Sequence, residues 1–294
     1  MNRSFRKYLW LAIALMLTIL AVILPTYLVS SLSIPSTLAG VQAAKWGNNV
    51  TISYIDKSFR FVSNGIPNHK REAEYIVPNA GMILPDPSTA QVVSDPTIAQ
   101  NYDFTIPLQP VKSDKPTRTN LGAIGVMISG AAMFNPYEGD NQTVALRDNF
   151  TMKSANGQDV AFLDSCNGHP TPMGDYHYHG LPKCITRTVD AEGEASHIIG
   201  VAFDGFPIYG DRALDGSKIT VDQLDACNGI TSATPEFPQG IYHYVLPDIK
   251  DVNSSIGCFT GKVSIEMSDF IKQHRMPPRR DLKRSSSDTH PTTP

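Results

Sequence analysis

The chain carries one sequence pattern twice. Residues 163–168 read Leu-Asp-Ser-Cys-Asn-Gly and residues 224–229 read Leu-Asp-Ala-Cys-Asn-Gly, and Tyr-His-Tyr follows each copy, at 176–178 and 242–244. The period, roughly sixty to seventy-five residues, is too long and the copies are too few for a solenoid of stacked repeats. We therefore expect one domain built from two related halves. A pseudo-two-fold axis between such halves would bring their Tyr-His-Tyr segments towards one shared place.

All four cysteines lie inside the two copies. Four cysteines allow three disulfide connectivities, and the duplicated order favours one bridge per half, Cys166 with Cys184 and Cys227 with Cys258. Closing the first loop would contribute about 3 kcal/mol by the loop-entropy relation. A cysteine-rich zinc knuckle is disfavoured because no Cys-x-x-Cys spacing occurs.

The composition indicates a globular, acidic body. Of the 294 residues, 41% are hydrophobic and 18% are charged, which is sufficient for a full core. The net charge of −3 conceals basic residues at both ends, so the segment between them is more acidic than the total suggests. Because an acidic body repels phosphate backbones, we expect no nucleic-acid partner.

The N-terminal segment has the pattern of a membrane anchor. No charged residue occurs between Lys7 and Lys45, and residues 8–24 are apolar apart from Thr18. As a helix this stretch spans ~26 Å, close to the hydrocarbon thickness, and extension to Val29 would complete a crossing. An uncleaved anchor is favoured over a signal peptide, because small-residue cleavage sites lie far beyond the apolar core. The basic start would keep the N-terminus in the cytoplasm and place the body outside, periplasmic or extracellular; a cleaved signal would make the chain secreted.

Four segments follow from these patterns. Residues 1–29 are expected to be a cytoplasmic start with the membrane anchor or signal peptide, and residues 30–45 a Ser/Pro/Ala spacer. Residues 46–267 are expected to form the folded domain. Residues 268–294 are basic and rich in Ser, Thr and Pro, which predicts a disordered tail.

The fold class predicted for the body is mostly β, one compact disulfide-stapled domain. Residues 50–55 alternate branched and polar side chains, residues 59–62 follow as a second strand, and residues 104–107 suggest an edge strand. Recurrent prolines between residues 75 and 116 exclude long helices there. Short strands joined by ordered turns are therefore expected over this part of the chain.

Two apolar segments containing glycine predict the core of each half. Residues 121–133 and 197–203 are nearly continuous apolar runs, the pattern of strands buried on both faces with close backbone approach at Gly125 and Gly200. A helix is expected only at residues 220–226, where Thr220 can cap the first turn.

The histidines suggest a metal site. On a strand His177 and His179 share one face, and His243 occupies the position in the second half that matches His177. If the halves pair, three imidazoles converge and leave a coordination position open, and His169 is a possible fourth ligand. Copper and zinc both fit such donors.

A reading without metal also accounts for these residues. A hydrogen-bonded polar network of His and Tyr could hold each disulfide loop in place without an ion. Asp164 and Asp225 invite interpretation as an acid–base pair, but an Asp two residues before a Cys more commonly accepts backbone N–H bonds at a turn. Asp175, beside the motif, could orient an imidazole.

Four stretches together resemble the YHYH domain family: residues 63–69, 122–136, 163–184 with Gly-His-Pro and Tyr-His-Tyr-His, and 200–210. The resemblance covers most of residues 61–261. It implies an exported or membrane-anchored domain, and the family supplies no established activity. The second copy has Val245 where the first has His179, which favours one asymmetric metal site over two equivalent ones.

Three functional hypotheses remain open at this point. The first is a membrane-anchored extracytoplasmic domain that binds copper or zinc through His177, His179, His243 and His169. The second is a metal-dependent hydrolase or oxidoreductase, in which the open position activates water or oxygen. The third is a metal-free surface or adhesion module that contacts glycans or protein.

Overall fold

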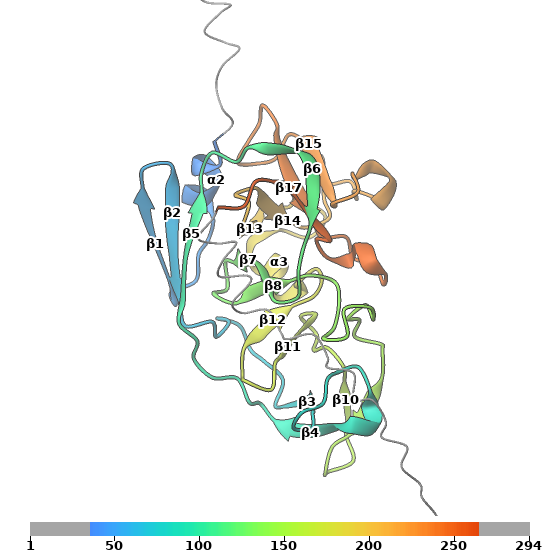
Figure 1. Cartoon of the computed structure of the whole chain (residues 1–294). Helices are drawn as coiled ribbons and strands as arrows, with labels where there is room; N and C mark the ends of the chain where they lie inside the picture. Colours follow the sequence, from blue (N-terminus) through green and yellow to red (C-terminus); the bar gives the residue numbers. More distant parts are fainter. Residues whose placement is uncertain (1–35, 265–294) are drawn as a thin grey trace, which may run out of the picture. The chain divides into compact units, whose positions relative to one another are not determined.

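The computed structural model describes residues 36–264, and these form a predominantly β domain (Figure 1). Its largest element is an eight-stranded sheet with the order β11-β12-β8-β7-β13-β14-β16-β15. The strands of this sheet are β7 (Ala123–Met127), β8 (Ala132–Phe134), β11 (Gly168–Pro170), β12 (Tyr176–Tyr178), β13 (Ile198–Ala202), β14 (Pro207–Tyr209), β15 (Gly229–Ser232) and β16 (Ile241–Val245).

The sheet is two-fold symmetric in its topology. In each half an antiparallel hairpin, β7-β8 or β13-β14, is followed by a parallel pair, β8-β12 or β14-β16, and then by an antiparallel pair with β11 or β15. The halves meet where β7 pairs antiparallel with β13, and Val126 opposite Val201 lies at the centre of this register. The expected pair of related halves is therefore present.

Close contact at the centre of the sheet requires glycine. A Cβ atom on Gly125 would lie 2.8 Å from the Val201 carbonyl oxygen, and one on Gly200 would lie 2.6 Å from the Val126 carbonyl oxygen. Real Cβ atoms do not approach backbone oxygen this closely, so a side chain at either position would separate the central strands. The predicted close approach of Gly125 and Gly200 is confirmed.

The two Tyr-His-Tyr strands lie far apart, contrary to the expectation of a shared place. Strands β8, β7, β13 and β14 separate β12 from β16, which corresponds to roughly 24 Å at the usual spacing between strands. The reason is that the apolar strands β7 and β13 occupy the middle of the sheet and place each Tyr-His-Tyr strand towards an outer edge (Figure 1).

Smaller sheets surround the large one. Strands β1 (Val50–Ile55), β2 (Ser58–Ser63) and β5 (Tyr102–Pro107) form a three-stranded sheet with β5 at one edge, as the alternating pattern predicts. The two-stranded sheets are β3 (Glu74–Pro78) with β4 (Ala90–Ser94), β6 (Lys112–Arg118) with β17 (Cys258–Gly261), and β9 (Thr151–Lys153) with β10 (Asp159–Ala161).

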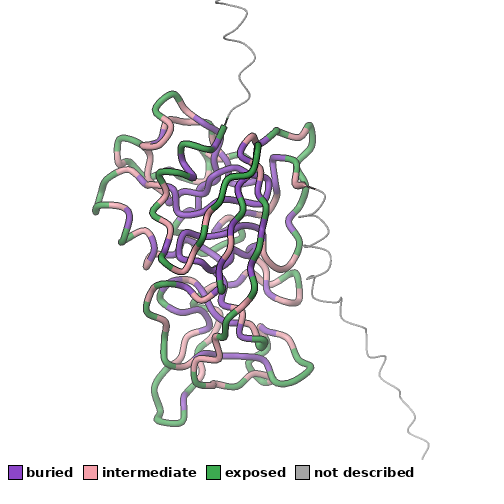
Figure 2. The backbone as a smooth tube through the Cα atoms, turned by 90° about the vertical axis from the view of Figure 1, so that its left-hand side faces the viewer, coloured by how far each residue is buried: buried purple, intermediate pink, exposed green. Residues whose placement is uncertain are grey.

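The buried hydrophobic residues form two clusters, and Figure 2 colours the buried stretches of the backbone purple. The larger cluster joins the eight-stranded sheet to Phe59 and Phe61 of β2, which are fully buried and flank the exposed Arg60. The smaller cluster packs Ile76 of β3 against Phe162 and Leu163. This smaller cluster brings the β3 region beside the Gly168–Pro170 strand.

The folded body begins earlier than the sequence analysis expects. Helix α2 (Leu38–Ala43) lies within the expected spacer 30–45, yet Val41 is fully buried in the larger cluster. The Thr37 backbone N–H donates to the Leu108 carbonyl at 2.8 Å. The domain therefore begins at Thr37, because an apolar side chain and a buried backbone bond attach residues 37–43 to it.

Within residues 36–264, helical structure is otherwise limited to α3 (Lys183–Val189) and three single 3₁₀ turns, η1 (Pro87–Thr89), η2 (Val221–Gln223) and η3 (Val252–Ser254). The predicted helix 220–226 is wrong in type, since only the η2 turn forms. Thr220 and Gln223 make a capping box around this turn, but Leu224 already has an extended backbone that leads into the second Cys-Asn-Gly loop. No helix within residues 36–264 is long and apolar enough to cross a membrane; the predicted anchor in 1–29 and the tail 268–294 lie outside the described residues.

The disulfide prediction is confirmed. Cys166 is bonded to Cys184, and Cys227 to Cys258, with Cα–Cα distances of 5.3 and 4.9 Å. Each bridge closes a loop within one half, so the bridges staple the two outer parts of the sheet separately.

The duplicated Asp residues act locally, as the turn interpretation predicts. Asp164 Oδ1 accepts hydrogen bonds from the N–H groups of Cys166 and Gly168 at 2.8 and 3.0 Å. Asp225 accepts the corresponding bonds from Cys227 and Gly229, both at 2.9 Å. Both carboxylates fix the Cys-Asn-Gly loops. Because their oxygens already accept hydrogen bonds from the loop backbone, they are poorly suited to act as an acid–base pair.

Asp204 is a buried carboxylate in the second half and gives the domain a defined pH response. Its side chain is fully buried and accepts bonds from the Tyr244 hydroxyl at 2.6 Å and the Gly261 N–H at 2.8 Å. Burial raises the pKa of Asp204 to about 6. Because this pKa exceeds the unfolded value of about 4, the stability that protonation contributes is complete below about pH 4 and is lost as pH rises through about 6.

We expect Asp204→Asn to change this pH dependence. Relative to the unchanged protein, the variant should gain up to about 3 kcal/mol in unfolding free energy between about pH 4 and pH 7, because it carries no charge to bury. Urea denaturation of both proteins at the two pH values measures this difference, and all other titrating groups cancel in the comparison. If the two proteins differ in unfolding free energy by the same amount at pH 4 and at pH 7, a pKa of about 6 for Asp204 is contradicted.

Candidate metal centre

Three histidines meet on one face of the β11-β12 hairpin. His169 of β11 lies directly opposite His177 of β12 in the antiparallel register, and directly opposed residues project to the same face. His179 lies two residues beyond His177 and returns to that face. The predicted shared face of His177 and His179 is confirmed, and His169 joins them.

The three imidazoles form a compact, buried cluster, called here the His triad. Each of the three residues is at most 3% exposed, and the potential ligand atoms all lie within 4.8 Å of one another. The ring centroids of His169 and His177 are 4.7 Å apart, and those of His177 and His179 are 4.8 Å apart. This spacing suits three donors around one ion.

Backbone carbonyls orient two of the rings. His177 Nδ1 lies 3.0 Å from the Asp175 carbonyl oxygen, and His179 Nδ1 lies 2.8 Å from the Asn135 carbonyl oxygen. A carbonyl only accepts, so each Nδ1 carries the proton. Each neutral ring therefore has its lone pair on Nε2, and these two Nε2 atoms are only 3.0 Å apart.

Asp175 supports the triad differently from the sequence expectation. Its backbone carbonyl, and not its carboxylate, orients His177. The carboxylate instead accepts a hydrogen bond from the Tyr102 hydroxyl of β5. This contact attaches the β11-β12 loop to the three-stranded sheet and so stabilises the carbonyl that faces the ring.

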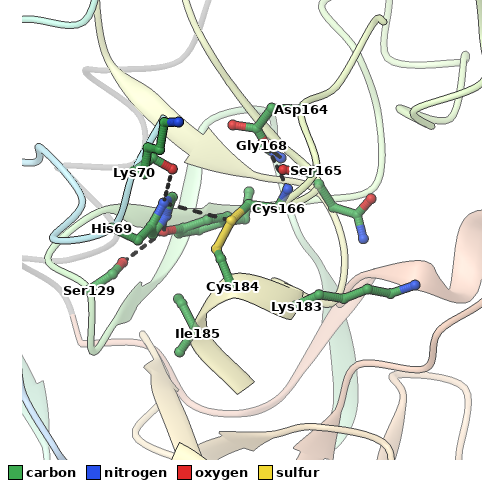
Figure 3. Close-up of a disulfide and its surroundings, with 12 residues drawn as sticks. His69, Lys70, Ser129, Asp164, Ser165, Cys166, Gly168, Lys183, Cys184 and Ile185 are labelled. Carbon is green, nitrogen blue, oxygen red and sulfur yellow. Dashed lines mark hydrogen bonds between the residues drawn. A yellow bond between two sulfur atoms is a disulfide. The ribbon is translucent and has the colours of Figure 1, made fainter. Parts of the chain in front are cut away.

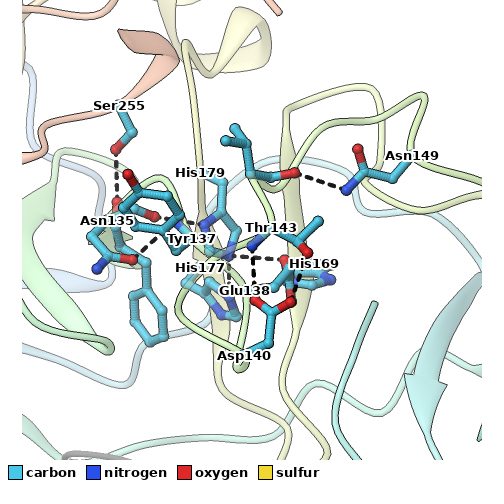
Figure 4. A network of polar contacts seen from close by, with 12 residues as sticks. Asn135, Tyr137, Glu138, Asp140, Thr143, Asn149, His169, His177, His179 and Ser255 are labelled. Carbon is cyan, nitrogen blue, oxygen red and sulfur yellow. Dashed lines mark hydrogen bonds and ion pairs between the residues drawn. The ribbon is translucent and has the colours of Figure 1, made fainter. Parts of the chain in front are cut away.

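Glu138 is the acidic residue beside the triad, and the sequence analysis missed it. Its Oε1 atom lies 3.7 Å from Nε2 of both His169 and His179 (Figure 4). The residue is 5% exposed, and Oε1 has no hydrogen-bond partner among the described residues. Burial raises the pKa of Glu138 to about 8. Such an unsatisfied buried carboxyl is expected to have a partner in the working protein.

Burial also keeps the histidines neutral. It lowers the pKa of His179 to about 4 and lowers the pKa values of His169 and His177 well below the ordinary value; the neighbouring imidazoles depress the latter two further. Neutral imidazole is the form that binds metal ions. At physiological pH the triad therefore offers nitrogen lone pairs without prior loss of a proton.

A small pocket reaches the triad from the surface. The His triad and Glu138 form its inner end, and its walls are mostly apolar, including Leu84, Leu121, Phe134 and Pro170. Phe134 stacks on the His177 ring at 3.8 Å between centroids. Met82 also lines the pocket and is 50% exposed. The cavity volume is about 80 Å³, enough for an ion with one or two small ligands.

His243 does not join this cluster, which corrects the expected three-strand convergence. It lies on β16 opposite Ile230, donates from Nδ1 to the Ile241 carbonyl at 3.0 Å, and contacts the Tyr209 ring. The order of strands places β16 in the other half of the sheet. Among the described residues, the grouping of metal-binding side chains at the triad contains only His169, His177 and His179.

Apart from His243, which corresponds to His177, the second half has no equivalent of the residues that form the site. Ile230 stands opposite His243 where His169 stands opposite His177. Val245 takes the place of His179. Ala213 and Glu138 begin corresponding turns that differ in length by one residue. The Ala213 N–H donates to the Ser217 carbonyl and the Glu138 N–H donates to the Thr143 carbonyl, each at 2.9 Å. Glu138 could therefore have been found by comparing the two halves of the sequence, because it is an acidic residue where the second half has the apolar Ala213.

His69 lies on the opposite face of β12, near the first disulfide (Figure 3). Its Nε2 is 2.6 Å from the Tyr178 hydroxyl, and its Nδ1 is 3.7 Å from Cys166 Sγ. His69 also groups geometrically with Cys166 and Cys184, but both sulfurs are in the disulfide and offer no thiolate. His69 therefore stabilises the first disulfide loop from the face of β12 opposite the His triad.

Comparisons with known proteins agree with these features. A protein-family model described as "YHYH protein" matches residues 103–222 and, in a second match, residues 213–261. The matched ranges include all eight strands of the large sheet, the His triad and Glu138. No curated protein and no solved structure matches the chain.

Proposed function

The chain belongs to the YHYH family, and we propose that its first Tyr-His-Tyr-His segment binds one transition metal ion. His169, His177 and His179 supply the nitrogen donors, and Glu138 lies beside them as a further ligand or as a proton acceptor. His243, which the sequence pattern included, is not part of this proposal.

One observation carries the proposal: two Nε2 lone pairs face each other at 3.0 Å. In a neutral, metal-free pair these lone pairs repel, whereas a cation between them would attract both. Two imidazole nitrogens bound to one copper or zinc ion at 2.0–2.1 Å lie about 2.9 to 3.4 Å apart, depending on the coordination angle. The triad is thus spaced for an ion of this kind before any ion binds.

Metal-dependent catalysis is a second candidate, favoured by the pocket. Three imidazoles leave a coordination position open, and the pocket gives a small molecule access to that position and to Glu138. The metal would lower the pKa of bound water. A carboxylate at Glu138 would accept the proton from a group held at the open position.

Metal binding is tested on the purified protein. We expect elemental analysis to find close to one equivalent of copper or zinc, or calorimetric titration of the stripped protein with Cu(II) and Zn(II) to give one saturable site. Saturation should also raise the melting temperature, because an ion that binds only the folded state stabilises it. Protein that stays metal-free through such titrations would contradict the proposal and leave the histidines as a structural network. Hydrolytic or oxidative turnover by the loaded protein would support the second candidate.

We also propose that the domain is anchored to a membrane with its body outside the cytoplasm. The uncharged residues after Lys7 support an anchor. The two disulfides support an oxidising compartment, since disulfides persist mainly in exported proteins.

We expect protease added to intact cells or spheroplasts to digest the domain, while an N-terminal tag remains protected. Membrane fractions should retain the chain after a high-salt wash, because an apolar anchor is insensitive to ionic strength. Immunoblotting of both ends of the chain measures this. A protected body would contradict the orientation, and a mature chain beginning after Ala39 or Ala43 would contradict the uncleaved anchor.

A further inference from the structure

We propose that the ion selected by the His triad is Cu(I) and that it reaches the triad past the thioether of Met82. This inference rests on the proposed metal site and specifies which ion that site takes. Three features of the pocket support it: the charge of the donors, the polarity of the walls and the sulfur at the entrance.

The donor set carries little negative charge. The triad supplies neutral imidazoles, and Glu138 is the one carboxylate among the described residues that line the pocket. Among neutral donors a monovalent ion brings one positive charge into the site and a divalent ion brings two, and loss of the Glu138 proton would offset only one charge of either ion. The cost of burying charge rises steeply with its magnitude, and all four residues are at most 5% exposed. The site therefore favours the monovalent ion.

The walls of the pocket oppose a strongly hydrated ion. Apart from the hydroxyl groups of Tyr137 and Thr171, the walls outside the triad and Glu138 offer no side-chain oxygen or nitrogen to replace the water that a divalent ion would lose on the way in. Cu(I) is a soft ion that thioether sulfur binds well. Mostly apolar walls and one soft thioether donor thus discriminate against Zn(II) and in favour of Cu(I).

Met82 provides such a soft donor where the pocket opens. Its side chain lines the pocket and is half exposed, so its sulfur is available to an incoming ion. Transfer is a ligand exchange: a copper–sulfur bond forms, and it breaks as copper–nitrogen bonds to the triad form. The oxidation state of copper does not change, and no proton or electron is required from elsewhere.

Met173 offers a matched control. It is 78% exposed and lies in the turn between β11 and β12, but it does not line the pocket. If exposed thioether sulfur alone captured copper, Met82→Leu and Met173→Leu would have equal effects. If position in the pocket matters, only Met82→Leu should alter loading.

The test uses the full chain under anaerobic conditions. Cu(I) buffered by bicinchoninate and Zn(II) buffered by a colorimetric chelator give the two affinities, and stopped-flow absorbance gives the rate of Cu(I) transfer. We expect Cu(I) to bind at least about a hundredfold more tightly than Zn(II). Met82→Leu should slow Cu(I) transfer several-fold, while Met173→Leu should transfer at the unchanged rate and His179→Ala should lose tight binding.

The possible failures are distinguishable. Tighter or equal binding of Zn(II) would overturn the selection of Cu(I) while leaving the proposed metal site intact. Transfer at the same rate in Met82→Leu and the unchanged protein would overturn the route past Met82. Failure of the chain to bind either ion would overturn the proposed function itself and this inference with it.

Discussion

Replacing His177 or His179 by alanine should weaken metal binding by at least about a hundredfold, because each ring supplies one of three nitrogen donors. The two losses should be similar, since the Nε2 atoms of these rings lie 3.0 Å apart and would share the same ion. Competition titration against a chelator of known affinity measures both losses. Circular dichroism of the stripped variants separates loss of the site from loss of the fold.

His243→Ala is the matched control for this experiment. His243 is equivalent to His177 by sequence, lies in a Tyr-His-Tyr strand, is also buried, and also donates from Nδ1 to a carbonyl two residues earlier. Its ring is nevertheless outside the triad. Metal affinity should therefore remain unchanged in His243→Ala. A loss equal to that of His177→Ala would show that both halves contribute ligands and would contradict the site described here.

Removing the first disulfide should weaken both the fold and the metal site. Cys166 and Cys184 are separated by 18 residues, and this loop contains the whole triad. Changing both cysteines to alanine should cost about 3 kcal/mol of unfolding free energy by the loop-entropy relation. The metal affinity of the folded variant should fall as well, because the ligand-bearing hairpin loses a covalent restraint.

Removing the second disulfide separates these two effects. Cys227 and Cys258 are separated by 31 residues, so the same relation gives a similar cost of about 4 kcal/mol. No triad residue lies in that loop. Urea denaturation should therefore show comparable destabilisation, whereas metal titration below the unfolding transition should show unchanged affinity. Equal losses of affinity in both double variants would mean that global stability, and not local restraint, controls the site.

Several features could be predicted because they depend on residues close together in the chain. The nearness of His169 to His177 follows from the short disulfide loop that contains both residues. The position of His179 follows from strand alternation. The turn roles of Asp164 and Asp225 follow from bonds to N–H groups two and four residues ahead. Each of these needs only local backbone geometry.

The start of the domain and the helix at 220–226 were predicted less well. Residues 37–43 form a short segment with no strong sequence pattern. Burial of Val41 and the hydrogen bond from the Thr37 N–H to the Leu108 carbonyl join this segment to the domain. Thr220 is a good cap, but capping alone does not extend a helix when the next residues must form the Cys227 loop. In both cases distant contacts override local propensity.

The duplication, the two disulfides and the shared face of His177 and His179 were determined by the sequence itself, because covalent spacing and strand periodicity act over short distances. Tertiary structure alone decided which of the matching histidines share a site. Strands β7 and β13 pair across Gly125 and Gly200, where no side chain would fit. This pairing buries the apolar strands at the centre of the sheet and separates His177 from His243. It is also the tertiary fold that places Glu138, about thirty residues before the triad in sequence, within 3.7 Å of two imidazoles.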